Sequence, residues 1–170
     1  MRQTVFWISY ILLLLGQLLL SNYFHFTPYV MLTILPVMVL CISIRVHRIP
    51  AMLIAMATGL VVDLLSEGLL GLNALALVPV AFVRDSIIRI LFGTELFARR
   101  EDFTVQNQGF GKVAFAVFMA LALFLAVYIW ADGAGMRPLW FNAARYGASL
   151  GASWLVSLLT LHVLASDSRR

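Results

Sequence analysis

Charge is what this sequence most lacks. Lys, Arg, Asp and Glu together make up only 12% of the 170 residues, whereas soluble domains carry about 25%. Apolar residues, counted without glycine, make up 62% of the chain, against roughly 45–50% in soluble domains even when glycine is included. The longest mainly polar stretch, 94–112, is too short for a separate soluble domain. These shortages exclude an ordinary soluble protein and predict a single transmembrane domain over 1–170.

The residues that most often build catalytic or metal sites are also scarce. The only cysteine, Cys41, cannot form a disulfide within the chain. The three histidines, His25, His47 and His162, lie on different apolar segments or the loops beside them, which disfavours a metal cluster. Only Asp63 is expected within a helix, whereas intramembrane hydrolysis by aspartates needs two facing each other. We therefore expect no enzyme, no cofactor and no metal.

Long apolar runs are abundant instead. Each is judged against the roughly 20 residues that a helix needs to cross a bilayer core. Backbone amides in lipid must be satisfied within the segment, so such runs are helices and not strands. The six predicted spans cover about 5–21, 28–44, 50–66, 70–91, 113–130 and 139–165. The first has one positive charge and no small-x-small cleavage site, so we expect a retained helix. The predicted fold is an all-α polytopic membrane protein.

The positive charges predict the orientation. If the N-terminus is cytoplasmic, ten of the twelve Lys and Arg residues lie on the inner side: Arg2, Arg45, Arg48, Arg84, Arg89, Arg99, Arg100, Lys112, Arg169 and Arg170. This bias predicts a multi-pass membrane protein with both termini in the cytoplasm. It also accounts for the net charge of +4 without any nucleic-acid partner.

The longest predicted cytoplasmic loop mixes charge with apolar side chains. It covers about 94–112 and continues a basic region that begins in the fourth span. The candidate contact residues are Arg84, Arg89, Arg99 and Arg100. One interpretation is an anchor at the headgroups of membrane lipids, and the other is a docking surface for a cytoplasmic partner. The sequence leaves both open.

An acidic residue interrupts the third span. Ala51, Ala55, Gly59 and Asp63 are spaced by four, so they share one helix face. Small residues at this spacing let a second helix approach closely, and the acid should therefore face protein and not lipid. Its position along the helix is roughly 20 Å from the inner end of a hydrocarbon core about 30 Å thick.

A tight hairpin should follow Asp63. Gly68 and Gly71 can adopt turn conformations that other residues avoid, and Asn73 stands where a new helix can be capped. The carboxyl group must find a partner through the fold. The candidates are Arg145, Arg137, Asn73, Gln17, Asn22 and the backbone of the hairpin itself. We favour a structural hydrogen bond over a role in proton transfer.

The sixth span carries a second line of small residues. Ala143, Gly147 and Gly151 repeat the spacing of four. This pattern predicts another packing face, for a helix of this chain or of a partner.

The hairpin carries a resemblance to a known family. The run MATGLVVDLLSEGLLGLNALAL resembles the signature of the MreD family of bacterial rod shape-determining membrane proteins, through Gly59, Asp63, Gly68, Gly71 and 73–77. Chain length and the number of predicted spans agree with that family. The polar loop that ends in GFGK is similar to that of MreD proteins from the Bacteroidetes group.

The resemblance implies a non-enzymatic scaffold. MreD-like proteins work with the single-span periplasmic protein MreC. Through MreC they act with MreB-like filaments and with a RodA-type synthase and its transpeptidase, in peptidoglycan synthesis and cell-shape control. The implied role is therefore a membrane subunit of the cell-elongation machinery.

The same resemblance supplies an alternative. The family is similar in fold to the substrate-binding subunits of energy-coupling-factor vitamin transporters. Those subunits usually carry an alanine-x-x-x-alanine docking motif near the first helix, where this chain has an unbroken apolar run at 11–15. They also line an outer cavity with several polar side chains, and this chain offers few beyond Gln17, Asn22 and Asn73. The scaffold is the favoured interpretation.

Overall fold

Helices are the only regular secondary structure in the described part of the chain. The computed structural model describes residues 2–23, 30–43, 46–67, 70–93, 109–133 and 138–167. Within these ranges there is no strand, which confirms the predicted all-helical class. The elements are α1 (Arg2–Tyr23), α2 (Leu35–Leu40), α3 (Arg48–Val62), the π-helical turn η1 (Asp63–Glu67), α4 (Leu72–Phe92), α7 (Phe110–Gly133) and α8 (Leu139–Asp167). Gly68, Arg99 and Arg100 lie outside the described residues.

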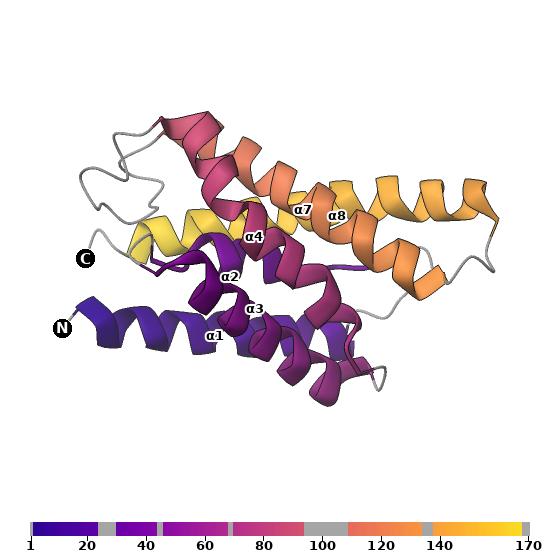
Figure 1. Cartoon of the computed structure of the whole chain (residues 1–170), viewed down its shortest axis with the longest axis horizontal. Helices are drawn as coiled ribbons and strands as arrows, with labels where there is room; N and C mark the ends of the chain where they lie inside the picture. Colours follow the sequence, from indigo (N-terminus) through magenta and orange to yellow (C-terminus); the bar gives the residue numbers. More distant parts are fainter. Residues whose placement is uncertain are drawn as a thin grey trace.

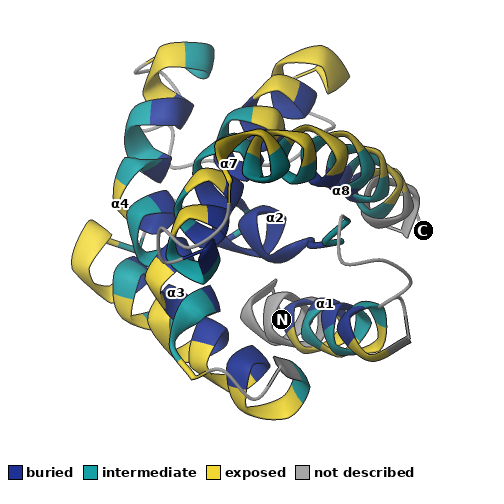
Figure 2. Ribbon diagram, turned by 90° about the vertical axis from the view of Figure 1, so that its right-hand side faces the viewer, coloured by how far each residue is buried: buried dark blue, intermediate teal, exposed yellow. Residues whose placement is uncertain are grey.

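The short helix α2 lies at the centre, and the long helices surround it. All six of its residues are buried, and Figure 2 shows α2 as a buried element enclosed by the others. Leu35, Met38 and Leu40 of α2 share one core with Leu77 of α4 and Phe124 of α7. In Figure 1, α1 begins and α8 ends at the same end of the molecule. The core thus holds together helices from all parts of the chain.

The described surface carries many large apolar side chains, and the mainly apolar interior also holds a set of polar ones. Large apolar side chains are exposed on every long helix, including Leu12, Leu53, Phe82, Phe115 and Leu159. The buried polar and charged residues are Gln17, Ser21, Thr33, Thr58, Asp63, Asn73, Arg84, Ser149, Ser153 and Ser157. Two described helical stretches, Arg48–Ser66 and Phe110–Gly133, are long and apolar enough to cross a membrane. A broad apolar exterior with polar groups inside fits a membrane protein.

The second apolar segment differs most from the prediction of one helix over 28–44. Residues 31–34 have no regular secondary structure, and helix α2 covers only Leu35–Leu40. Pro36 stands in the first turn of α2, where its missing N–H costs no hydrogen bond. Pro36 also lacks the N–H that would donate to the Leu32 carbonyl in a longer helix, and its ring would clash with that carbonyl, so the helix does not extend towards Thr33.

Two serines of α8 supply the hydrogen bonds that this non-helical backbone lacks. The Met31 amide donates to Ser149 Oγ at 2.9 Å, and the Thr33 amide donates to Ser153 Oγ at 3.1 Å. Ser153 Oγ in turn donates to the Met31 carbonyl at 3.0 Å. Both serines are fully buried. The hydroxyl groups therefore replace the internal bonds of a helix, as buried backbone in an apolar environment requires.

A glutamine of α1 holds the same segment from another side. The Ile34 amide donates to Gln17 Oε1 at 2.7 Å, and Gln17 Nε2 donates to Ser21 Oγ at 3.1 Å. Gln17 is 1% exposed, so its amide group works entirely inside the protein. The segment before α2 is thus fixed to α1 as well as to α8.

Removing the hydroxyl group of Ser153 should destabilise the fold, whereas removing that of Ser157 should not. Ser157 lies one turn further along the same buried face, and its Oγ has no hydrogen-bond partner. Ser153→Ala strands two backbone groups, at about 1–3 kcal/mol each. We expect a lower melting temperature in detergent for Ser153→Ala and an unchanged or higher one for Ser157→Ala. Equal effects of the two substitutions would contradict this role of Ser153.

Candidate functional site

The acid of the third span lies where α3 ends. Helix α3 gives way to the π-helical turn η1 at Asp63, and the Asp63 side chain is fully buried. Ala51, Ala55 and Gly59, which share its face, are buried as well. The predicted small-residue face therefore lies against protein, with the carboxyl group at its end.

The carboxyl group of Asp63 caps the beginning of the next helix. Its Oδ2 accepts hydrogen bonds from the backbone amides of Gly71, at 2.9 Å, and Ala74, at 3.4 Å. Its Oδ1 accepts from the backbone amide and the side-chain Nδ2 of Asn73, at 3.1 and 2.9 Å. The first amides of a helix have no partner within it. Asp63 satisfies those of α4 from a neighbouring helix, because α4 has no capping side chain of its own at Gly71.

No cation is needed to hold this acid. All four bonding groups are donors, which suits an ionised carboxylate because both of its oxygens only accept. The positive end of the α4 dipole adds favourable electrostatics. Of the predicted partners, Asn73 and the hairpin backbone contact Asp63, whereas Gln17 bonds Ile34 and Arg145 pairs with Asp132.

A close approach of two backbones makes this capping possible. A Cβ atom placed on Gly59 would lie 2.4 Å from Cα and 2.5 Å from the backbone nitrogen of Ala74. Only glycine fits at such a contact, and it brings the start of α4 within reach of the Asp63 carboxylate one turn later. Gly71 has φ of +100°, a conformation that glycine adopts without strain. The two glycines and the acid thus form one joint between α3 and α4.

The same helix face is tied to α1 by a pair of hydroxyl groups. Tyr10 OH and Thr58 Oγ1 are 2.7 Å apart, and Thr58 also donates to the Ile54 carbonyl at 2.8 Å. Thr58 directly precedes Gly59, so this contact joins α1 to α3 beside the joint. The sequence shows Tyr10 as one aromatic residue in an apolar run and gives no sign of this pairing.

The arginine expected as a cytoplasmic contact is buried. Arg84 is 0% exposed, and its Nη2 donates to the Ser43 carbonyl at 3.1 Å. Its Nε lies 3.8 Å from Asp85 Oδ1. This burial argues against the predicted surface role for Arg84, while Arg89 in the last turn of α4 is exposed. The guanidinium group instead fixes the turn that follows α2.

The sequence predicted that Asp63 is the only aspartate within a helix, and this prediction is wrong. Asp85 lies in α4 and Asp132 in α7. Asp85 pairs with Arg48 and Arg84, and Asp132 pairs with Arg145. Both acids therefore have basic partners. The pair of Arg48 and Asp85 links α3 to α4, and the pair of Arg145 and Asp132 links α8 to α7.

The small residues of α8 pack against nothing within the described chain. Gly147 and Gly151 are exposed, and a Cβ placed on either would meet no atom within 4 Å. Helix α8 contacts α7 through other residues: Tyr146 OH donates to the Ala122 carbonyl at 3.1 Å, and Trp154 Nε1 donates to that of Ala114 at 3.1 Å. The predicted packing face of Gly147 and Gly151 therefore points away from α7.

Comparisons of the chain with protein-family models, with curated protein sequences and with solved structures find no match. The resemblance of the hairpin to the MreD signature therefore depends on the sequence of the hairpin alone and stays a prediction. The joint between α3 and α4 brings together the described members of that motif, Gly59, Asp63, Gly71 and Asn73.

Substitutions of Asp63 and Asn73 should rank by the number of donors that they leave unpaired. Asp63→Ala leaves four donors without an acceptor, and Asp63→Asn turns an NH2 group towards amide donors on one side. Asn73→Ala removes only one of the four bonds. At about 1–3 kcal/mol per buried unpaired group, melting temperatures should fall in the order Asn73→Ala, Asp63→Asn, Asp63→Ala. A wild-type melting temperature for Asp63→Ala would refute the capping role.

Two glycine substitutions should have opposite effects on stability. Gly59→Ala forces the α3 and α4 backbones apart and should cost at least about 1–3 kcal/mol. Gly147→Ala adds a methyl group in open space and should be neutral or gain up to about 1 kcal/mol from helix propensity. Thermal unfolding of both variants in the same detergent checks this. Similar loss in both would contradict the close approach at Gly59.

Proposed function

We propose that this protein is a non-enzymatic membrane scaffold of the bacterial cell-elongation machinery. It spans the inner membrane six times, binds an MreC-like single-span protein, and through it supports a RodA-type peptidoglycan synthase with its transpeptidase and MreB-like filaments. Its fold is similar to that of the substrate-binding subunits of energy-coupling-factor transporters. Both termini are cytoplasmic.

The observation that carries this proposal is the joint between α3 and α4. The resemblance to MreD depends on residues from α3 and from the beginning of α4. Those that the structure describes meet at one place. Gly59 admits the backbone of α4, Asp63 caps it, and Gly71 and Asn73 supply donors. A carboxylate committed to four structural bonds supports a rigid framework better than a proton carrier.

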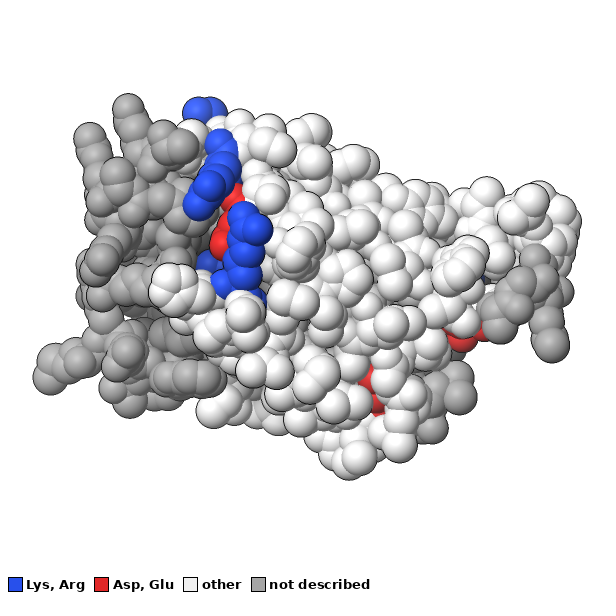
Figure 3. Space-filling model, in the orientation of Figure 1, with Lys and Arg blue, Asp and Glu red and all other residues white. Residues whose placement is uncertain are grey.

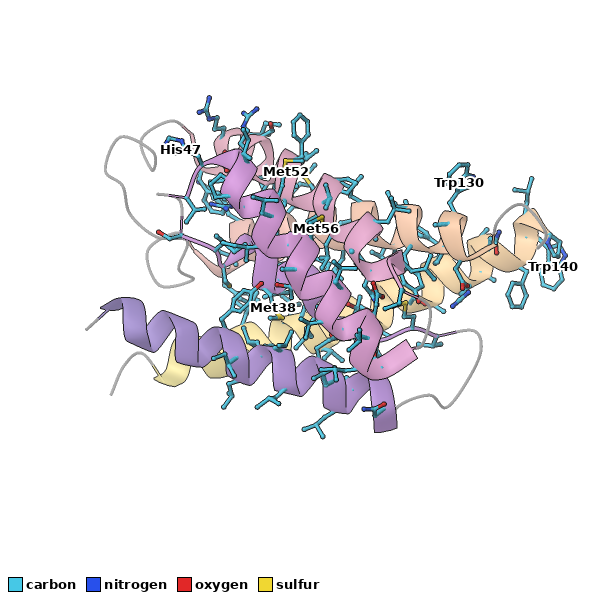
Figure 4. All side chains as sticks on the ribbon, turned by 60° about the horizontal axis from the view of Figure 1, so that its bottom comes forward. Met38, His47, Met52, Met56, Trp130 and Trp140 are labelled. Atoms are coloured by element: carbon cyan, nitrogen blue, oxygen red, sulfur yellow. The ribbon has the colours of Figure 1, made fainter. Side chains whose placement is uncertain are left out.

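The distribution of side chains supports the six-span arrangement. Segment 30–34 with α2 counts as one broken span, because its non-helical part is bonded inside the protein. Figure 4 shows Trp130 and Trp140 at one end of the molecule and His47 at the other. Both tryptophans are exposed, at 81% and 71%, as in the aromatic belts of membrane proteins. The basic residues Arg48, Arg89 and Lys112 begin or end helices at the end opposite the tryptophans, which fits the cytoplasmic side.

The open face of α8 is the surface that we assign to the partner helix. Gly147 and Gly151 leave room for close approach, and exposed Leu155 and Leu159 continue the same line. In lipid, close packing and not hydrophobicity brings helices together. A single-span partner supplies one helix, which is what one such face can hold.

Co-purification from bacterial membranes tests the proposed function. A tagged copy of the chain should bring down an MreC-like single-span protein, identified by mass spectrometry. Absence of such a protein, together with tight binding of a vitamin, would replace the scaffold by the transporter subunit.

A glycine-to-leucine pair tests the assigned face. Gly151→Leu should reduce recovery of the partner at least about tenfold, which equals about 1.4 kcal/mol, without lowering the melting temperature. Gly111→Leu is the matched control, because Gly111 is also exposed in a helix with nothing within 4 Å. Equal recovery with both variants would remove α8 as the partner face.

A further inference from the structure

An ion pair between α3 and α4 marks a common level near one end of both helices. The Nε of Arg48, at the start of α3, lies 3.4 Å from Asp85 Oδ2 in α4. Figure 4 shows His47, the residue before Arg48, at the end of the molecule opposite Trp130 and Trp140. Figure 3 shows Lys and Arg side chains gathered in one band near one end of the visible face. Because exposed charged side chains at helix ends reach the headgroups, the pair marks where both helices enter the hydrocarbon.

From this level both helices rise less than the thickness of a bilayer core. Helix α3 has 15 residues, which rise about 22 Å before Asp63 at about 1.5 Å each. In α4, Leu72 lies about 20 Å along the helix from Asp85 by the same rise. The two lengths agree, and both fall short of the roughly 30 Å of hydrocarbon in a bilayer.

Helix α7 shows a complete crossing in the same chain. No charged residue stands between Lys112 and Asp132, and this interval rises about 30 Å, the thickness of the core. Lys112 is exposed, and Asp132 pairs with Arg145 of α8. Figure 1 shows the outer ends of α7 and α8 extending past the turn between α3 and α4 along the long axis. That turn therefore lies deeper than the turn between α7 and α8.

The turn between α3 and α4 exposes leucines. Leu64 and Leu65 of η1 are 69% and 54% exposed, and Leu70, shortly before α4, is 67% exposed. The Ser66 hydroxyl donates back to the Val62 carbonyl at 2.6 Å, so its bond lies within its own helix. Exposed apolar side chains gathered at one place mark a surface that contacts something other than water.

The backbone donors of this turn are bonded inside the protein. Amides at the start of a helix in water can bond to water, whereas in hydrocarbon they need a partner within the protein. Asp63 accepts from the amides of Gly71, Asn73 and Ala74. A helix that begins in lipid needs an internal cap of this kind.

We propose that the turn between α3 and α4 ends inside the outer leaflet, where lipid acyl chains cover Leu64, Leu65 and Leu70. A bilayer adapts to a short hydrophobic span by thinning, so the outer leaflet is thinner beside this turn than beside α7 and α8. With this thinning both helices still cross the bilayer. Thinning also lowers the cost of an ionisable residue, Glu67, in the turn. The proposal rests on the membrane embedding in the proposed function and needs no partner protein.

Labelling of single cysteines tests the depth of the turn. Cys41, the only cysteine, is replaced by alanine, and the purified full chain is reconstituted into phosphatidylcholine vesicles. Leu70→Cys and Leu139→Cys are a matched pair, because both leucines are exposed, at 67% and 87%, beside the start of a helix. A sulfonated maleimide on both sides of the membrane should react at least about tenfold more slowly with Leu70→Cys, since its charge excludes it from hydrocarbon. Equal rates in the folded proteins, with equal rates after denaturation, would overturn the proposal.

Quenching by lipid identifies the contact and separates this proposal from membrane embedding itself. Bimane is attached to Leu65→Cys, to Leu139→Cys and to Leu53→Cys, whose leucine is 56% exposed within α3. Lipids with brominated acyl chains should reduce the fluorescence at Leu65 as much as at Leu53, and more than at Leu139. Quenching at Leu53 without quenching at Leu65 would overturn the proposal and leave the embedding intact. No quenching at any position would contradict the embedding.

Labelling in bacterial membranes separates lipid from a partner protein as the cover of the turn. Leu70→Cys should react slowly both in bacterial membranes and in vesicles of the purified chain. Slow reaction in bacterial membranes with fast reaction in the vesicles would assign the cover to a protein and overturn the proposal.

Discussion

Every backbone polar group placed in apolar surroundings needs a partner, and the breaks in helical structure are where this protein must supply one. The main break described lies between α3 and α4, where the first amides of α4 lose the partners that a continuous helix would give them. Asp63 provides those partners from α3. The carboxylate can do so only because Gly59 lets the two backbones touch. The relative position of α3 and α4 follows from this joint.

The second break is solved by the same means with different residues. The backbone before α2 takes its bonds from Ser149 and Ser153 of α8 and from Gln17 of α1. Helices from both ends of the chain are thereby joined to the central helix through polar contacts. Apolar packing then fills the space around α2. The buried polar groups at these two breaks thus have structural roles.

Much of this could be predicted from the sequence, because apolar run length and residue spacing are local properties. The helical class, the burial of Asp63 and the participation of Asn73 and Gly71 belong to that part. Pro36 is a local sign of the break before α2, but the length of the apolar run 28–44 predicted one continuous helix. The burial of Arg84 has no local signal, since it depends on the Ser43 carbonyl brought near by the fold.

Small-residue spacing shows the limit of sequence reasoning most clearly. Gly59 and Gly147 lie in the same kind of pattern, yet Gly59 touches the backbone of α4 and Gly147 faces open space. The spacing of small residues indicates that another helix can approach closely. It does not indicate whether one does. Serines 149, 153 and 157 likewise repeat every four residues, but only the first two meet unpaired backbone.

Amide hydrogen exchange at the beginning of α4 tests the central claim most directly. The amides of Gly71, Asn73 and Ala74 precede or begin a helix and would exchange quickly if they were bonded only to water. Capping by Asp63 predicts that they exchange as slowly as amides in the middle of α4, and that Asp63→Ala makes them fast while the middle of α4 stays protected. Fast exchange of all three in the unmodified protein would contradict the account.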